Sequence, residues 1–301
     1  MANAKPMLAA EALPGQVKYP KLASCKLNGC RGLKMNGRMM ARSLKEIPNP
    51  HVQAMFSAAN LEGMDGELVV GDFSSPDVFP TTQGGVMGGA AIDCKFYVFD
   101  IWDLPDYSFE MRVEILKQRV ADANHPNVIL VPQKLVHSDA EAQAFMDWAV
   151  SQGYEGAVLR EPTAKYKYGR STEAEGGFLR LTPWYTMEGT ITGIFEGRTN
   201  NNPATTNELG RTKRGTKQEF MVPNGTAGSM VIKLHSHFLV GPNQELAVTI
   251  SGDVLCAWYW ANRDTVPGKI VRVRFKQPVK EQGLPRFAQL EGFRDPIDMS
   301  A

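Results

Sequence analysis

The chain has 301 residues, of which 43% are hydrophobic and 22% are charged, and its formal net charge at pH 7 is +1. These values are typical of a globular protein with room for two hydrophobic cores, and they exclude a disordered or strongly basic chain. No apolar run reaches the roughly 18 residues that a membrane-spanning helix needs, so we expect no membrane span.

The N-terminal segment and the cysteines both indicate a cytoplasmic protein. The opening residues, MANAKPMLAAEALPGQ, offer one lysine and a short apolar patch without a clear cleavage site, so we expect no signal peptide. The cysteines form neither a CxxC pair nor a set at zinc spacing, which is typical of a reducing compartment. They are Cys25, Cys30, Cys94 and Cys256.

The first 185 residues mix strand and helix patterns. Strands are expected at 18–34, 64–71, 92–102, 155–160 and 177–182, where apolar, aromatic and β-branched residues lie between glycine turns. The glycine-rich stretch 81–89 is expected to be a mobile loop. Amphipathic patterns predict helices at about 108–122 and 138–152, and Ser138 and Asp139 are the expected caps of the second one.

After about Met187 the pattern changes to short strands separated by turns. They are expected at 188–197, 229–236, 246–252, 269–277 and 285–295. Several short strands without long helices between them favour a small closed or half-open β-barrel. We therefore expect an α+β chain of two domains, 1–185 and 186–301, with a polar loop at about 198–229 in the second.

Several short motifs follow one another in a fixed order. They are Lys26-Leu27-Asn28-Gly29-Cys30-Arg31, Asp65-Gly66-Glu67, 96–100 (FYVFD), 155–160 (EGAVLR), 166–172 (YKYGRST) and 178–183 (FLRLTP). Taken singly, a lysine before a glycine turn is typical of a surface hairpin, and Phe99 in an apolar strand is typical of a core. The joint order is what indicates a function.

This ordered set resembles the motifs of the covalent nucleotidyl transferases, which comprise DNA ligases, RNA ligases and mRNA capping enzymes. Within that superfamily it is similar to the small bacteriophage-type ATP-dependent DNA ligases, from about Lys18 to Asp295. The similarity includes 41–43 (ARS), 285–287 (PRF) and 293–295 (FRD). It implies an N-terminal nucleotidyltransferase (adenylation) domain with antiparallel sheets and flanking helices, followed by a C-terminal OB-fold β-barrel.

The resemblance also implies a reaction, in which a 5′-phosphate is joined to a 3′-hydroxyl in nicked duplex DNA through an adenylate on Lys26. NAD-dependent ligases carry a nicotinamide-recognition domain before the nucleophile and a cysteine-rich zinc module. Neither fits the 25 residues before Lys26 or the four cysteines, so ATP is the implied cofactor. A phage-encoded chain of this kind would act as a monomer in the cytoplasm of a bacterial host.

The resemblance assigns a role to each site residue. Lys26 is the implied nucleophile, Glu67 and Glu155 are the implied ligands of Mg²⁺, and Phe99 is expected to stack on the adenine. Arginines are expected to bind ribose and phosphate oxygens. The residues expected to bind the cofactor are Ser24, Cys25, Lys26, Arg31, Arg42, Glu67, Phe99, Glu155, Arg180 and Thr182.

Three positions depart from the family pattern. Asn28 stands where the family has an aspartate that takes part in joining the 3′-hydroxyl, so we count it as a catalytic position on which the last step depends. Arg180 and Thr182 align with a Lys-x-Lys pair, and the alternative match at 165–167 lies only ten residues after Glu155. The C-terminal motif at 294–296 (RDP) lacks a lysine that often follows the aspartate.

Duplex binding is expected from basic residues, most of them in the second domain. They are Arg170, Arg211, Lys213, Arg214, Lys217, Lys269, Arg272, Arg274 and Arg294. The alternation of Arg272 and Arg274 fits the solvent face of a strand equally well. Two alternatives stay open: an RNA or mixed RNA/DNA end-joining ligase, which Asn28 favours, and a non-catalytic nucleic-acid-binding relative. A capping enzyme fits the motifs less well.

Overall fold

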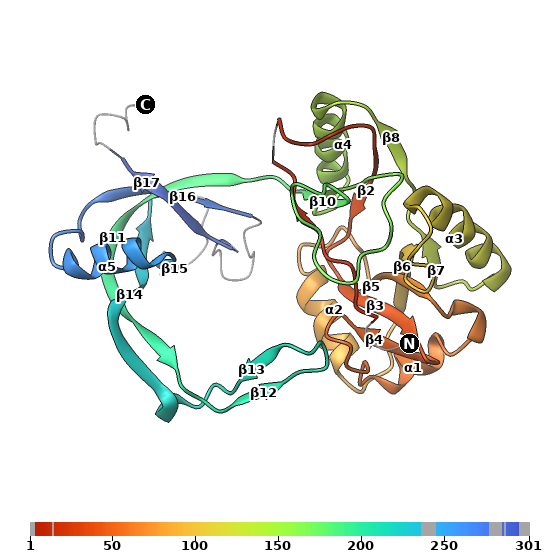
Figure 1. The fold of residues 1–301 in the computed structure, drawn as a ribbon, viewed down its shortest axis with the longest axis horizontal. Coiled ribbons are helices and arrows are strands. Elements are labelled where there is room, and N and C mark those ends of the chain that lie inside the picture. The colour runs from red at the N-terminus through yellow and green to blue at the C-terminus, as the bar shows by residue number, and fades with distance from the viewer. Residues whose placement is uncertain (1–3, 14, 236–244, 277–284, 286, 295–301) are drawn as a thin grey trace. The chain divides into compact units, whose positions relative to one another are not determined.

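The computed structural model describes residues 4–13, 15–235, 245–276, 285 and 287–294, and it divides into two compact units at Thr182 and Pro183 (Figure 1). The sequence prediction placed the boundary three residues later, between 185 and 186. Arg286 and Asp295, which belong to the C-terminal similarity, lie outside the described residues.

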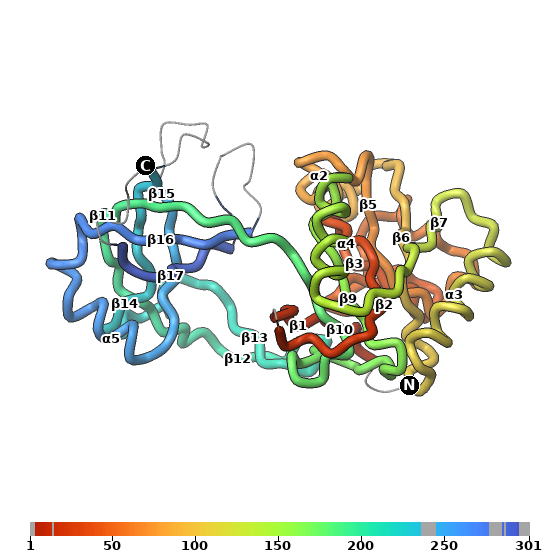
Figure 2. The backbone as a smooth tube through the Cα atoms, turned by 90° about the horizontal axis from the view of Figure 1, so that it is seen from above, coloured from red at the N-terminus to blue at the C-terminus, as the bar shows by residue number. Residues whose placement is uncertain are grey.

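The first unit contains two five-stranded sheets (Figure 2). One has the order β1-β10-β9-β2-β8, with β1 at Ala10–Glu11, β10 at Phe178–Leu181, β9 at Gly156–Arg160, β2 at Lys21–Lys26 and β8 at Lys134–Val136. The other has the order β4-β3-β5-β6-β7, with β4 at Arg38–Ala41, β3 at Cys30–Met35, β5 at Met64–Val70, β6 at Cys94–Ile101 and β7 at Val128–Leu130. Among the strand pairs of the described residues in this unit, β1–β10 and β6–β7 are parallel and the others are antiparallel. The turn 27–29 carries the chain from one sheet to the other.

The two predicted helices of this unit are confirmed as α3 (Phe109–Ala123) and α4 (Asp139–Ser151). Serine caps begin both of them, because Ser108 accepts a hydrogen bond from the Met111 amide and Ser138 accepts one from the Glu141 amide. A short α1 (Pro50–Met55) and the 3₁₀ turn η1 (Ala59–Leu61) complete the packing. Buried Phe56, Phe96 and Leu116 join these helices to the second sheet in one core.

The glycine-rich stretch was predicted to be a loop, and this prediction is wrong. Residues Val78–Met87 form α2. Val78, Thr82 and Val86 recur at intervals of four and are all buried, so one face of the helix packs on the protein. This burial outweighs the low helix propensity of two adjacent glycines.

The second unit consists mainly of one antiparallel sheet with the order β15-β14-β11-β16-β17. Its strands are β11 (Tyr185–Asn200), β14 (Met221–Leu234), β15 (Glu245–Thr249), β16 (Ile270–Phe275) and β17 (Gln289–Phe293). The mixed α+β class and the predominance of sheet match the prediction. The described strands form an open row and no closed barrel, because no ladder joins the edge strands β15 and β17.

Two features of the second unit were not predicted. The helix α5 (Asp253–Ala261) packs on β14 and β11, and its Tyr259 lies in the core with Ile191 and Val271. Strands β11 and β14 are also longer than expected, since β14 begins inside the predicted loop. The rest of that loop holds the hairpin β12 (Ala204–Thr206) and β13 (Thr212–Arg214) and the turn η2 (Gln218–Phe220).

Candidate active site

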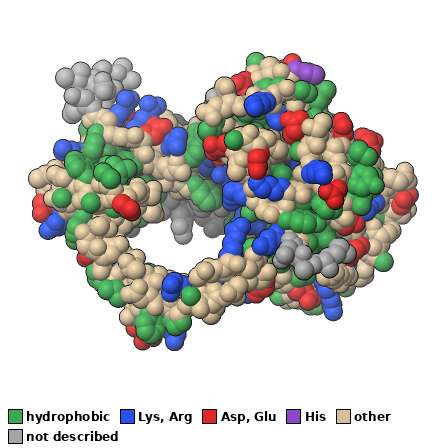
Figure 3. Space-filling view, in the orientation of Figure 1, with side chains coloured by type: hydrophobic (Ala, Val, Ile, Leu, Met, Phe, Trp, Pro, Cys, Tyr) green, Lys and Arg blue, Asp and Glu red, His purple; other side chains and the backbone are tan. Residues whose placement is uncertain are grey.

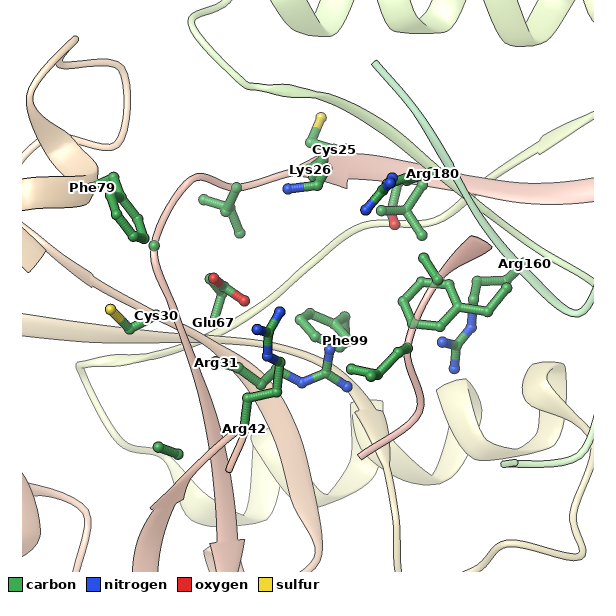
Figure 4. Close-up of a pocket in the computed structure, with 18 of the residues that line it drawn as sticks. Cys25, Lys26, Cys30, Arg31, Arg42, Glu67, Phe79, Phe99, Arg160 and Arg180 are labelled. Atoms are coloured by element: carbon green, nitrogen blue, oxygen red, sulfur yellow. The ribbon is translucent and has the colours of Figure 1, made fainter. Parts of the chain in front are cut away.

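A pocket of about 520 Å³ lies in the first unit, and both sheets contribute to its walls (Figure 4). Its volume is within the usual range for ligand pockets, about 300–1,000 Å³. Strands β2, β9 and β10 of one sheet and β3, β5 and β6 of the other supply about half of its lining residues. Of the residues expected to bind the cofactor, the lining includes Ser24, Cys25, Lys26, Arg31, Arg42, Glu67, Phe99 and Arg180.

Lys26 is the last residue of β2, and β9 holds it in place. The two strands pair with Lys26 opposite Gly156, and the Glu155 amide donates to the Lys26 carbonyl at 2.9 Å. The Lys26 ammonium forms an ion pair with the Glu155 carboxylate. Their side chains are 27% and 24% exposed, so neither is fully buried. Glu155 therefore belongs to the site through Lys26, although it does not line the pocket.

Two glycines are needed for this geometry. A Cβ on Gly29 would come within 2.2 Å of the Leu68 carbonyl oxygen, so the turn after Lys26 can pass over β5 only as glycine. Gly156 has a φ of +151°, and a Cβ there would come within 2.5 Å of the Leu181 carbonyl oxygen. The glycines in the KLNG and EG motifs thus permit the close backbone approach that positions Lys26.

Glu67 lies on β5, opposite Arg31 of β3. Burial raises the pKa of Glu67 to about 7, although the charges of Lys26 and Arg31 lower it, and the nearby carboxylates of Glu155 and Asp65 add to the rise. An additional positive charge close to such a buried carboxylate would stabilise its ionised form.

The donor chemistry at this point fits a divalent cation. Among the described residues, no group of three or more His, Cys, Asp or Glu side chains could hold a metal by itself. Mg²⁺ commonly uses one or two carboxylates together with substrate phosphates and water, and Glu67 and Glu155 provide two such carboxylates beside Lys26. The raised pKa of Glu67 is the feature that a cation would offset.

Arg31 is fixed inside the protein rather than extended toward a ligand. Its Nε and one terminal nitrogen donate to the two oxygens of the fully buried Asp65, both at 2.5 Å. Asp65 also accepts a 2.6 Å hydrogen bond from the Tyr166 hydroxyl, which in turn accepts from the Met7 amide. The Arg31 guanidinium lies 4.7 Å from the centre of the Phe99 ring. Arg31 therefore supports the pocket wall and the ring expected to carry the base.

Other arginines of the pocket are held by the N-terminal segment. Arg180 donates to the Glu11 carboxylate at 2.6 Å, and Arg170 donates to the Ala9 carbonyl at 2.7 Å. Arg42 also lines the pocket. Arg170, which was expected to bind nucleic acid, lines this pocket as well. The exposed Arg180 side chain and the strap 7–11 thus share one wall.

A second buried cluster lies behind the pocket, around Asp100. Arg112 donates to both Asp100 oxygens, at 2.7 and 3.2 Å, and Arg160 forms a further ion pair with the same carboxylate. Burial lowers the pKa of Arg160 to about 9. Its guanidinium lies against the rings of Phe109 and Phe178. Asp100 follows Phe99 directly, so this cluster holds the strand that presents the Phe99 ring.

Sequence reasoning left several of these residues without a role. Asp65 and Arg160 were seen inside motifs, and their neighbours in sequence gave no indication of buried ion pairs. Glu11 lies in a segment without any motif. Conversely, besides Glu155, two expected cofactor or catalytic positions, the half-buried Asn28 and the buried Thr182, are not part of the pocket lining.

The basic residues of the second unit fall into two groups. Arg211, Lys213, Arg214 and Lys217 are exposed on and beside the β12–β13 hairpin. The basic residues on and beside β16 and β17 have partners on β11 and β17. Lys269 lies 5.5 Å from the Phe293 ring centre, and Arg272 is 3.3 Å from Glu291. Arg274 donates to Gln289 at 3.1 Å, and Arg294 donates to Glu188 at 2.9 Å. Lys and Arg side chains are visible along the surface of both units (Figure 3).

An aromatic platform accompanies the second group. The Trp184 ring lies 4.6 Å from the Arg274 guanidinium and 3.6 Å from the Lys276 ammonium, measured from the ring centre. Tyr185 stacks on Phe275 with ring centres 5.9 Å apart.

No helix in the described part of the chain is long and apolar enough to cross a membrane.

The comparisons with known proteins agree with this geometry. Residues 6–174 match the family model of the ATP-dependent DNA ligase domain. A probable DNA ligase of Mycolicibacterium vanbaalenii is 30% identical over 120 residues, and one of a Nocardioides species is 26% identical over 140 residues. These matches cover 38% and 44% of this chain, but only 21% and 26% of the relatives' own length.

Solved structures match nearly the whole chain. The DNA ligase-adenylate of Chlorella virus has a TM-score of 0.55 and 26% identity, and the match covers 97% of this chain and all of that one. A Lig E DNA ligase has a TM-score of 0.67 and 20% identity, with 95% and 100% covered, and shows likeness of fold. Because the residues 6–174 that match the family model make up more than half of this chain, the chain belongs to the ATP-dependent DNA ligase domain family.

Proposed function

We propose that this chain is an ATP-dependent DNA ligase that seals 5′-phosphate/3′-hydroxyl nicks in duplex DNA. The observation that carries the proposal is the contact of Lys26 with Glu155 in a pocket that also contains Glu67 and several arginines. The lysine amine, the carboxylates of Glu67 in the pocket and of Glu155 in contact with Lys26, and the guanidinium groups are what nucleotidyl transfer needs: a nucleophile, a place for a cation and donors for phosphate oxygens.

The proposed first step is the attack of the Lys26 amine on the α-phosphorus of ATP. The bond from Nζ to phosphorus forms, the bond to the β-phosphate oxygen breaks, and pyrophosphate leaves with the electron pair. The amine loses a proton in this step, and Glu155 is the carboxylate in direct contact with it. The adenylyl group then passes to the 5′-phosphate of the nick, and the 3′-hydroxyl displaces AMP.

Several residues would orient the nucleotide. Glu67 and Glu155 would hold Mg²⁺, which neutralises charge on the phosphate oxygens when it is bound. Arg42 and Arg180 line the pocket and are candidates for phosphate binding. The Phe99 ring is the candidate platform for adenine, because the Arg31–Asp65 pair and the Asp100 cluster support it from behind.

The second unit is proposed to be an OB-like module that binds the duplex. The exposed hairpin residues Lys213 and Arg214 suit contact with phosphates, and so does Lys217. Elsewhere in this unit, Trp184 and Tyr185 expose aromatic surface, and Trp184 lies next to the basic side chain of Arg274, as in nucleic-acid platforms. These groups recognise backbone charge and stacked bases rather than sequence, which suits a monomeric enzyme that must act at any nick.

The asparagine at position 28, where the family has an aspartate, favours a second candidate function, a ligase for RNA-containing strands. Two measurements test both proposals. Incubation with α-labelled ATP and Mg²⁺ should label the protein covalently, whereas a non-catalytic binder would stay unlabelled. Sealing of matched DNA/DNA, RNA/DNA and RNA/RNA nicks should then be fastest on DNA/DNA. Preference for an RNA strand at the 3′ side would favour the second candidate.

A further inference from the structure

A second cavity, of about 750 Å³, adjoins the pocket that we propose for ATP. Helix α4 and residues 129–136 supply most of its lining. Three residues, Cys25, Leu27 and Gln133, line both spaces. The two spaces are therefore neighbours within the first unit and share a wall.

The charges around the two spaces differ. The lining of the first contains six cationic side chains and one carboxylate, which suits a polyphosphate. The lining of the second contains one cation, Lys134, and one carboxylate, Glu141, both on exposed residues. Burial raises the pKa of the Cys25 thiol to about 11 and also raises the pKa of the Tyr97 and Tyr154 hydroxyls, so these three groups stay neutral. The second cavity therefore favours a neutral molecule over a polyphosphate.

Four aromatic rings line the second cavity, those of Tyr97, Phe145, Trp148 and Tyr154. Phe145 and Trp148 contact each other on α4, with ring centres 5.5 Å apart, and Trp148 is 51% exposed. The Phe73 ring stacks on Tyr154 with ring centres 4.5 Å apart. Rings that neighbouring side chains already hold in place provide a preformed surface for an aromatic ligand.

The second cavity also lies next to the residues of the proposed reaction. Cys25 and Leu27 precede and follow Lys26 in the chain, and Tyr154 precedes Glu155. Residues that line the cavity therefore flank both members of the Lys26–Glu155 ion pair. In the proposed first step, the Lys26 amine has to turn from Glu155 toward the α-phosphorus. A molecule packed against the flanking residues would restrain this movement.

We propose that the second cavity is an effector site for a neutral, largely aromatic small molecule, and that its occupant slows transfer of the adenylyl group to Lys26. The volume suits a drug-sized molecule, since ligand pockets of about 300–1,000 Å³ bury most of such a ligand's surface. The occupant and ATP would bind side by side. The effect on Lys26 rests on the proposed ligase function, whereas the binding itself does not.

Binding is tested with N-phenyl-1-naphthylamine, a neutral aromatic amine whose fluorescence rises in apolar surroundings. Wild-type protein should bind one probe molecule saturably, with a Kd on the order of 10 µM. Ala144→Trp places a large ring in the cavity from an exposed position on α4 and should weaken binding about tenfold or more. Ala140→Trp is the matched control, because it makes the same change at an exposed position of α4 outside the lining.

Thermal unfolding checks that both variants keep the fold. Equal binding by the two variants, or no saturable binding by the wild type, would overturn the site. The neutral class of ligand is tested with 1-anilinonaphthalene-8-sulfonate, which has the same rings and a negative charge. It should bind about tenfold more weakly, because its charge loses hydration in an apolar cavity. Equal or tighter binding of the anion would contradict a neutral ligand.

The effect on Lys26 is tested by labelling with α-labelled ATP at saturating probe. The kcat of labelling should fall about fivefold in the wild type and in Ala140→Trp, at an unchanged KM for ATP, and Ala144→Trp should not respond to the probe. A raised KM at unchanged kcat would mean that the probe competes with ATP and would overturn a separate site. Saturable binding with unchanged kcat and KM would overturn the effector role. A wild-type protein that binds the probe but is never labelled would overturn the ligase proposal and the effector role, and leave the binding site standing.

Discussion

The two walls of the pocket that we propose for ATP differ in what their charged side chains contact. On one, Lys26 lines the pocket and directly contacts Glu155, which lies outside the lining, and both side chains are partly exposed. On the other, Arg31 pairs with buried Asp65, and Arg170 and Arg180 bond to the N-terminal strap. The first wall therefore consists of groups that substrate can reach, and the second of groups that also hold the fold together. Substitutions in the first should change chemistry, and substitutions in the second should change stability.

The largest expected loss of stability comes from the second wall. Asp65→Asn removes a buried carboxylate from Arg31 and Tyr166, and the loss of one partner of a buried ion pair typically costs about 3–5 kcal/mol. Urea unfolding measures this change in the free energy of unfolding. Asp106→Asn is the matched control, because Asp106 is 86% exposed in its pair with Lys165. If Asp65→Asn cost no more than that control, the second wall would not support the fold.

Glu67→Gln should slow labelling by ATP and raise the free energy of unfolding at pH 8. The carboxylate has a pKa raised to about 7 in the folded protein, so wild-type stability falls as pH rises from about 4.5 to 7. The glutamine variant lacks this loss and should be more stable than wild type at pH 8, by about 1–2 kcal/mol after allowance for partial exposure, but not at pH 4. Labelling by ATP should drop on the order of a hundredfold.

Thermal unfolding at the two pH values, without Mg²⁺, checks this prediction. A variant that is less stable than wild type at both pH values would show that Glu67 serves the fold, as Asp65 does. The contrast between the two walls would then disappear.

Asn28→Asp should have a smaller effect, confined to the last step. A carboxylate at position 28 could orient the attacking 3′-hydroxyl or help to hold metal, which the amide does less well. Sealing of a pre-adenylated nick should speed up about tenfold, equivalent to about 1.4 kcal/mol of barrier, with little change in labelling of Lys26. Single-turnover sealing measures this. Equal or slower sealing would mean that the site is adapted to asparagine.

Glu11→Gln should have the smallest effect. It weakens the bond that holds Arg180 to the strap, and a pair with an exposed arginine contributes about 1 kcal/mol or less. Arg180 becomes available to phosphate, so we expect a modestly lower KM for ATP at unchanged stability. Titration of the labelling rate against ATP concentration tests this expectation. A higher KM would mean that Glu11 aligns Arg180 for the nucleotide.

The sequence predicted the first wall better than the second. The positions of Lys26, Glu67 and Glu155 followed from short motifs whose backbones pair directly in the sheets, so their order along the chain was informative. The partners of Arg31 and Arg180 could not be predicted in the same way. Glu11 lies 169 residues from Arg180 in a segment without a motif, and its contact depends on the parallel pairing of β1 with β10.

The missed helices have a different explanation. In α2, two adjacent glycines indicated a loop, whereas burial of three side chains on one face determined the structure. The nine residues of α5 are apolar on most sides, so they show no clear helical period.

The central claim is that Lys26 receives the adenylyl group. The wild-type protein, Lys26→Ala and Lys26→Arg are each incubated with α-labelled ATP and Mg²⁺, and labelled peptides are mapped by mass spectrometry. Wild-type protein should carry an acid-labile adenylate on Lys26. Both variants should fold and remain unlabelled, because alanine has no amine and a guanidinium stays protonated. Normal labelling of Lys26→Ala, or an adenylate mapped to another residue, would contradict the account.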